Sequence, residues 1–208
     1  MASVHELAVT LGRRLARGTG HKERAALLGY GLEIILGSAF EIAAILVLGW
    51  LFGCLGPVAL ALAVASTLRL FSGGNHCSAY YRCFVLSLVV FLSLGGAARL
   101  LAAALPPLPL FLLGLGSWAA ALVVVLVLAP VEGKIRLDRR PGVRRRRRVY
   151  SILCVAAWGA AGALGGAEAA MAVSLGLAWQ AFSLTGWGRG FIQQVDRLLT
   201  PGGGGEGR

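Results

Sequence analysis

The sequence predicts an all-α, polytopic membrane protein with six transmembrane helices and an N-terminal interfacial amphipathic helix. The 208-residue chain is 57% hydrophobic and only 14% charged, whereas roughly 25% of the residues in a soluble domain are charged. Runs of about 18 apolar residues are long enough to cross a bilayer as helices. A soluble bundle is excluded because no polar faces exist to cover such helices. Asp, Glu, Lys and Arg are absent from residues 42–68, 83–98, 100–131, 149–167 and 169–188.

The N-terminal segment, residues 1–28, is expected to stay at the cytoplasmic membrane surface. Over residues 1–22, apolar side chains recur at helical spacing from Val4 to Leu15, and three arginines fall largely on another face. This pattern is typical of a helix that lies on the membrane and contacts anionic lipid. A short solvated helix is the alternative.

Six spans follow, within a single integral-membrane domain over residues 1–200. The second span is shorter than the ~20 residues that a bilayer needs, so it is expected to be tilted, embedded or partly re-entrant. Residues 202–205 are all glycine, and the tail over 201–208 is predicted to be disordered. The predicted spans cover residues 29–53, 57–70, 80–105, 108–129, 149–164 and 168–187.

The basic residues predict the orientation of the spans. With six spans, nineteen of the twenty Lys and Arg residues fall on one side, and only Arg99 falls on the other. Cytoplasmic loops carry such an excess of positive charge. Both termini, the stretch 69–83 and the Arg-rich loop before the fifth span should therefore face the cytoplasm.

The stretch "RLFSGGNHCSAYYRC", residues 69–83, interrupts the apolar runs. Gly73 and Gly74 would break a helix and let the backbone approach a ligand. His76 and Cys83 are a base and a potential nucleophile, and a nearby imidazolium lowers the pKa of a thiol. Seven residues of one helix span ~10 Å, so His76 should lie in a bend after Gly74 that folds back towards Cys83.

As a bare pattern, His-x6-Cys is a weak signal for catalysis, because a loop histidine and a packed thiol are the commoner reason for it. Cys77 adjoins His76 and is the weaker candidate nucleophile. The four cysteines show no CxxC and no zinc-ribbon spacing, so neither a disulfide framework nor a metal or other cofactor is expected.

The longer string is far more specific. Arg69, the glycine pair, His76 and Cys83 together resemble the accessory gene regulator protein B (AgrB) family, whose members have an Arg…Gly-Gly-x-His-x6-Cys signature after the second apolar span. "AP-x-E-x-K" at 129–134, "GLEIIL" in the first span and six spans in about 200 residues also resemble this family.

This resemblance implies a membrane-embedded cysteine endopeptidase of bacterial quorum sensing, in the cell membrane, with its active site on the cytoplasmic side. It would remove the C-terminal tail of an AgrD-like precursor peptide through a thioester on Cys83, activated by His76. An internal Cys or Ser of the precursor would then close a thiolactone or lactone ring. The resemblance also implies a homodimer. No nucleic-acid partner is expected, because the positive charge follows the membrane topology.

Supporting roles are expected for further residues. Arg69 either snorkels at the end of its span or orients substrate, with Gly73 and Gly74 giving access to the backbone. Glu33 lies within or near the bilayer, where carboxylates are costly and usually functional or paired. It is a candidate to orient His76 or to pair with Arg69.

The motif at the end of the fourth span leaves two alternatives open. Pro130, Glu132 and Lys134 are either ordinary loop residues or line the exit of the peptide. The nine basic residues between Lys134 and Arg148 fix topology and contact anionic lipid, or they also recruit an acidic precursor tail.

Three other kinds of protein compete with this interpretation. A small transporter or peptide exporter usually has internal repeats, and none is found between residues 29–105 and 108–187. An enzyme of lipid head-group chemistry would need clustered aspartates, whereas Asp138 and Asp196 are far apart in the chain. A non-enzymatic assembly factor is the third.

Overall fold

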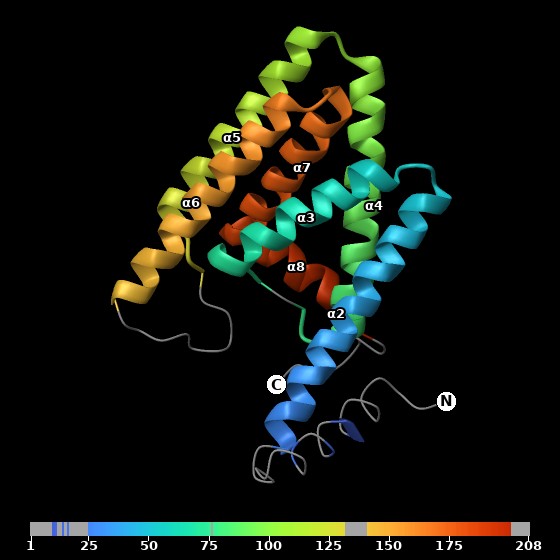
Figure 1. Ribbon diagram of the computed structural model, residues 1–208, viewed down its shortest axis with the longest axis vertical. Helices are drawn as coiled ribbons and strands as arrows, with labels where there is room; N and C mark the ends of the chain where they lie inside the picture. Colours follow the sequence, from blue (N-terminus) through green and yellow to red (C-terminus); the bar gives the residue numbers. More distant parts are fainter. Residues whose placement is uncertain are drawn as a thin grey trace. The chain divides into compact units, whose positions relative to one another are not determined.

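The computed structural model describes residues 10–11, 14, 16, 25–75, 77–131 and 141–200. Every secondary-structure element named among them is an α-helix (Figure 1). This confirms the all-α fold. The helices are α2 (Ala25–Leu51), α3 (Leu55–Ser72), α4 (Tyr80–Ala104), α5 (Pro107–Leu128), α6 (Pro141–Leu164), α7 (Ala167–Leu184) and α8 (Gly186–Leu198).

The chain divides into two compact units, Met1–Leu46 and Val47–Arg208. In the first unit, α2 exposes large apolar side chains, with 64% of Ile35 and 60% of Phe40 exposed. Such exposure is costly in water and suits a helix that contacts lipid. The predicted surface helix over 1–22, apart from residues 10, 11, 14 and 16, and the predicted tail over 201–208 lie outside the described residues.

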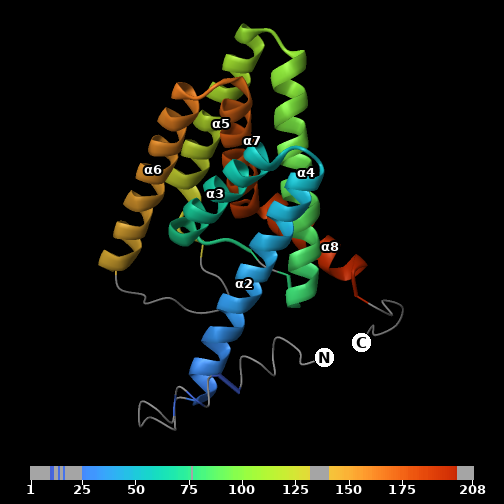
Figure 2. The same cartoon turned by 45° about the vertical axis from the view of Figure 1, so that its right-hand side comes forward.

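In the second unit, α7 is the central helix. It packs against α3, α4, α5, α6 and α8, which surround it in both ribbon views (Figures 1 and 2). A Cβ at Gly176 would lie 2.9 Å from the carbonyl oxygen of Ala61, so glycine allows α7 to approach α3 closely. A cluster of buried side chains lies between α3, α5, α6 and α7 and contains Val64, Leu68, Ala121, Val125, Ala129, Val155, Val173, Leu177, Ala181 and Leu184.

Four of the described helices are long and apolar enough to cross a membrane, and a fifth crossing is reached if α7 and α8 count as one bent span. The four segments are Leu28–Leu51, α3, α4 and α5. The chain is therefore a polytopic membrane protein, but the exact count of six spans is not confirmed. The apolar part of α6 begins only at Val149, after a run of five arginines.

The sixth span that the sequence predicts over 168–187 is broken in the structure. Helix α7 ends at Leu184, and α8 leaves it at an angle of 86°. Thr185 caps the new helix, because its Oγ1 accepts the Gly188 N–H at 3.0 Å. A Cβ at Gly188 would overlap the carbonyl oxygen of Phe182, so the corner needs glycine there.

Helix α6 also begins earlier than predicted. Pro141 is its first residue, a position that suits the fixed φ of proline. The five arginines Arg144–Arg148 therefore lie on the first turns of a helix and not in a loop.

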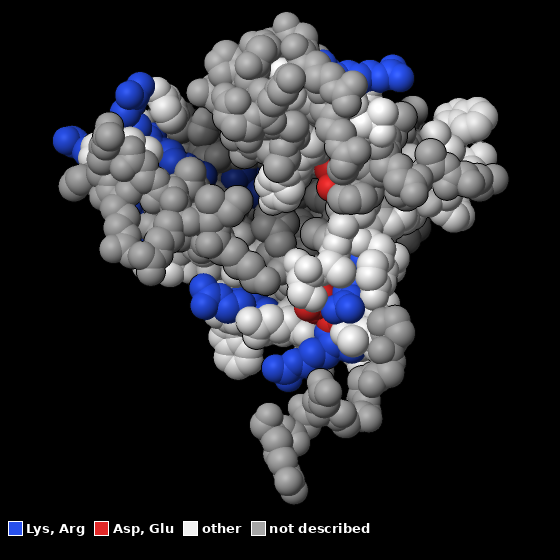
Figure 3. Space-filling view, turned by 90° about the horizontal axis from the view of Figure 1, so that it is seen from below, with Lys and Arg blue, Asp and Glu red and all other residues white. Residues whose placement is uncertain are grey.

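Basic side chains of the second unit gather at one end of its helices. Arg147 donates to the carbonyl oxygens of Leu70 and Phe71, both at 3.2 Å, and Arg148 donates to that of Ala129 at 2.8 Å. These bonds tie the start of α6 to the ends of α3 and α5. Arg99, near the opposite end of α4, donates to the carbonyl oxygen of Gly53. Most charged atoms visible in Figure 3 are those of Lys and Arg.

Candidate functional site

The glycine pair forms the sharp end of α3. The Gly73 N–H donates to the carbonyl oxygen of Arg69 at 2.9 Å, and Gly73 has a φ of 75°, in the left-handed region that favours glycine. A Cβ at Gly73 would also overlap the carbonyl oxygen of Val131. Gly74 follows with a φ of 153°. The chain thus leaves α3 in a conformation that other residues resist, and this bend ends the helix at the glycine pair.

This bend brings together the two motifs that carry the family resemblance. Gly73 and Val131 form a parallel β-bridge, and the Val131 N–H donates to the carbonyl oxygen of Ser72 at 2.8 Å. Pro130 adjoins this bridge. The beginning of the "AP-x-E-x-K" segment therefore lies directly against the glycine pair.

Two residues of α7 form hydrogen bonds with the same loop. The buried Gln180 donates from Nε2 to the Ser72 Oγ at 3.1 Å and to the Gly73 carbonyl oxygen at 2.9 Å. One turn later, the Ser183 carbonyl oxygen accepts from the Asn75 side-chain amide at 2.9 Å. The loop backbone is thereby anchored to a helix distant in sequence.

Arg69 points into the loop. Its guanidinium donates to the carbonyl oxygen of Asn75, the residue that precedes His76, and it lies close to Gly74. Arg69 therefore braces the loop backbone.

Cys83 lies on the first turn of α4, where its N–H donates to the Ala79 carbonyl oxygen at 3.3 Å. The loop residue Cys77 lies within hydrogen-bonding reach of the Cys83 side chain. Partial burial, the nearby Cys83 and the Asp196 carboxylate raise the pKa of the Cys77 thiol from its usual 9.0 to about 11, while Arg82 opposes the shift. Cys77 is therefore protonated near neutral pH.

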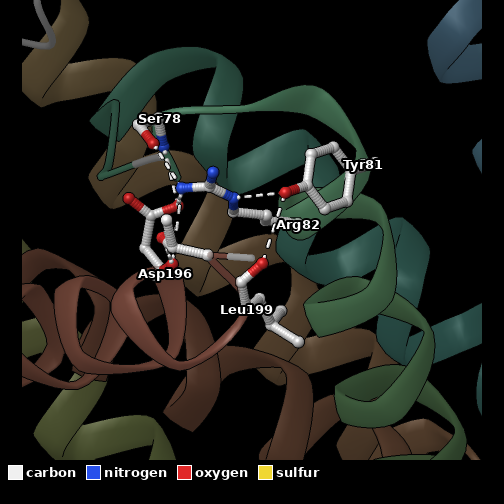
Figure 4. A network of polar contacts seen from close by, with 6 residues as sticks. Ser78, Tyr81, Arg82, Asp196 and Leu199 are labelled. Atoms are coloured by element: carbon white, nitrogen blue, oxygen red, sulfur yellow. Dashed lines mark hydrogen bonds and ion pairs between the residues drawn. The ribbon is translucent and has the colours of Figure 1, made fainter. Parts of the chain in front are cut away.

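The far side of the loop is tied to α8 (Figure 4). Arg82 forms an ion pair with Asp196, with 3.3 Å between Nη1 and Oδ1. The same Oδ1 accepts the Ser78 N–H at 3.1 Å. The loop and the first turn of α4 thus both bind the Asp196 carboxylate of α8.

The family model of Accessory gene regulator B matches residues 6–184. The chain belongs to the accessory gene regulator B family. The match includes the Arg…Gly-Gly-x-His-x6-Cys string and the "AP-x-E-x-K" segment, and it ends at the last residue of α7. No curated protein and no solved structure matches the chain at a significant level.

Several residues of the family motif are not placed by the structure. His76, Glu132 and Lys134 lie outside the described residues. Glu33 lies on α2 in the first unit, so its pairing with Arg69 or His76 stays a prediction. Among the residues that the structure describes, no three His, Cys, Asp or Glu side chains gather as metal ligands would.

Sequence reasoning gave no role to Gln180, Ser183 or Asp196. The available signal was the presence of Gln180 and Ser183 in an uncharged, largely apolar segment. Buried polar groups of this kind need hydrogen-bond partners, but the sequence does not say which. The sequence also gave no sign of the contact between Cys77 and Cys83, because it depends on the path of the loop in which Cys77 lies.

Proposed function

We propose that this chain is a membrane-embedded cysteine endopeptidase that removes the C-terminal tail of an AgrD-like quorum-sensing precursor. Besides the family match, one structural observation supports the proposal. The segment between Arg69 and Cys83 is held by α3, α7, α8 and the Val131 backbone, which is more support than a plain connecting loop requires. Pre-organised supports of this kind keep catalytic groups in productive geometry.

In the proposed reaction, the Cys83 thiolate attacks the carbonyl carbon of the scissile peptide bond. His76 takes the thiol proton and gives it to the departing amide nitrogen, so that the tail leaves as a free amine. The remaining carboxyl group is held as a thioester on Cys83. The thiol or hydroxyl of an internal Cys or Ser in the precursor then attacks this thioester, closes the thiolactone or lactone ring and restores the Cys83 thiol.

The membrane position favours ring closure over hydrolysis. Exchange of a thioester with a thiol is close to thermoneutral, whereas attack by water would release a linear acid. A site at the membrane edge limits the access of water. We therefore place the reaction at the basic end of the helices, on the cytoplasmic side, with both termini on that side.

The state of Cys77 supports Cys83 as the nucleophile. A thiol with a pKa of about 11 presents little thiolate at neutral pH, and the thiolate is the attacking species. As a protonated neighbour, Cys77 is suited to donate its S–H towards the Cys83 sulfur. The family motif, whose cysteine is Cys83, points to the same residue.

The proposal is tested in proteoliposomes with a synthetic AgrD-like peptide that has an amphipathic N-terminal part, an internal Cys and an acidic C-terminal tail. Cys83→Ala should abolish cleavage while membrane insertion stays intact, and Cys77→Ala should retain cleavage. His76→Ala should cost roughly 10²–10⁴-fold, and chelators should have no effect. Full activity of Cys83→Ala, or inhibition by a chelator that zinc reverses, would contradict the proposal.

A further inference from the structure

The start of α4 lacks a cap of its own. Its N-cap residue is Ala79, and no side chain of that residue caps the helix. The first N–H groups of a helix need acceptors and favour a nearby negative charge. The Asp196 carboxylate brings such a charge from α8, and its Oδ1 accepts the N–H of Ser78, the residue before the N-cap, at 3.1 Å.

Arg82, on the first turn of α4, binds both Asp196 and Ser78. Its Nη1 lies 3.3 Å from the Asp196 Oδ1, 3.4 Å from the Asp196 carbonyl oxygen and 3.0 Å from the Ser78 Oγ. The exposed fractions of the two side chains in the ion pair are only 14% and 18%. The pair is therefore less open to water than an ordinary surface salt bridge.

A second tie runs beside the first. The Tyr81 hydroxyl donates to the Leu199 carbonyl oxygen at 3.2 Å and accepts from the Arg82 Nε at 2.9 Å. Figure 4 shows these groups converging between the start of α4 and the end of α8. The guanidinium of Arg82 is thus held by its Nε and Nη1 at once, which fixes its plane.

The residues held by this network flank the proposed catalytic pair. Ser78 lies two positions after His76, and Arg82 immediately precedes Cys83. On the other side of His76, Asn75 is fixed by Arg69 and by the Ser183 carbonyl oxygen. The segment that carries both reacting groups is consequently held at both ends, and its second anchor lies in α8, beyond the residues that the family model matches.

We propose that Asp196 is a positioning residue that fixes the loop of His76 and the first turn of α4 for attack by Cys83. This inference rests on the proposed function. Asp196 touches neither the substrate nor the sulfur in this role. It acts through the Ser78 N–H and the Arg82 guanidinium, and α8 serves as the brace that carries it.

The test compares Asp196→Leu, Asp196→Asn and Arg82→Gln with the matched control Arg197→Gln, which changes an exposed neighbour outside this network. In the full-length protein in proteoliposomes, iodoacetamide labelling of Cys83 gives a rate and a final stoichiometry. Cleavage of the AgrD-like peptide gives kcat and KM separately. Asp196→Leu should lower kcat roughly ten- to a hundredfold with little change in KM, because misplaced reacting groups lose rate.

Conservative replacement provides rescue. Asparagine keeps an oxygen acceptor for the Ser78 N–H, so Asp196→Asn should lose less rate than Asp196→Leu, and Arg197→Gln should lose none. The double variant Arg82→Gln with Asp196→Leu should lose no more than the worse single variant, because both changes break the same contact. If Asp196→Leu fails to insert, the test uses the kcat values of Asp196→Asn and Arg82→Gln. Values below that of Arg197→Gln support the positioning role, and values equal to it overturn the role.

Failure of this inference differs from failure of the proposed function. Cys83-dependent cleavage with wild-type kcat in Asp196→Leu overturns the positioning role and leaves the peptidase intact. If Asp196→Leu lowers the fraction of Cys83 that is labelled but leaves the labelling rate at the wild-type value, part of the protein is unfolded. That result also overturns the positioning role of Asp196. If no peptide is cleaved by the wild-type protein, a Cys83 labelling rate that falls in Asp196→Leu and not in Arg197→Gln still supports positioning.

Discussion

At the residue scale, the site depends on groups whose chemistry is set by their neighbours. The sequence indicated that Gly73 and Gly74 end a helix, and the proposal that Cys83, rather than Cys77, is the nucleophile came from the motif. The contacts of Gly73 with Val131, and of Cys77 with Cys83 and Asp196, could not be read from the sequence. The roles of His76, Glu132 and Lys134 still rest on the family motif.

Cys77 should be slow to alkylate at pH 8. A raised pKa means that the folded protein favours the neutral thiol, so thiolate forms only as the pH approaches about 11. A shift from 9.0 to about 11 lowers the thiolate fraction at pH 8 about a hundredfold. Iodoacetamide labelling followed by peptide mass mapping measures this rate. In Cys83→Ala, Cys77 should label faster, because a neighbour that raises its pKa is gone. Equal rates in the folded and unfolded protein would contradict the shift.

Gly73→Ala should destabilise the protein and impair cleavage. The left-handed backbone costs a residue with a Cβ about 1–3 kcal/mol, and the new Cβ would overlap the Val131 carbonyl oxygen. Gly116→Ala in α5 is the matched control, since a Cβ there has open space. Thermal unfolding in detergent should separate the two variants, and a Gly73→Ala protein as stable as Gly116→Ala would show that the bend tolerates a side chain.

At the element scale, the sequence predicted α3, α4 and α5 within a few residues, since Pro and Gly bound their apolar runs. It missed the start of α6, because the arginines were read as a loop although arginine is a good helix former. It missed α8 entirely. That helix is amphipathic and begins after a corner that depends on Gly188 and the cap from Thr185, which only packing reveals.

The arginines of α6 should divide into two groups. Replacing Arg144, Arg145 and Arg146 with Gln should raise KM for an acidic-tailed precursor with little change in kcat, and the effect should shrink as salt rises. Arg147→Gln should instead lower stability, because it loses the bonds to the carbonyl oxygens of Leu70 and Phe71. An unchanged KM in the triple variant would leave those charges as topology signals only.

At the scale of the whole molecule, composition was enough to predict a polytopic membrane protein, and the motif residues between Arg69 and Cys83 indicated the family. The count of spans was less secure, because α6 begins with five arginines and α7 bends into α8. The loop supports from Gln180, Ser183 and Asp196 join segments about a hundred residues apart. No local pattern in the sequence specifies such pairings.

The orientation predicted from the basic residues is tested by labelling single cysteines in intact cells with a membrane-impermeant reagent. Substitutions near Arg144 and Gly202 should stay unlabelled, whereas substitutions around Pro106 should react. This labelling pattern is expected because membrane insertion keeps loops that are rich in Lys and Arg on the cytoplasmic side. Labelling near Arg144 from outside would reverse the orientation and, with it, the cytoplasmic active site.

The central claim is that Cys83 carries the precursor as a thioester, and intact-protein mass spectrometry tests it most directly. A precursor whose internal Cys or Ser is replaced by Ala cannot close the ring, so its N-terminal fragment should accumulate on the enzyme. We predict an added mass equal to that fragment, mapped to Cys83, released by hydroxylamine and absent in Cys83→Ala. A tail released with no adduct on Cys83, or an adduct that persists in Cys83→Ala, would contradict the account.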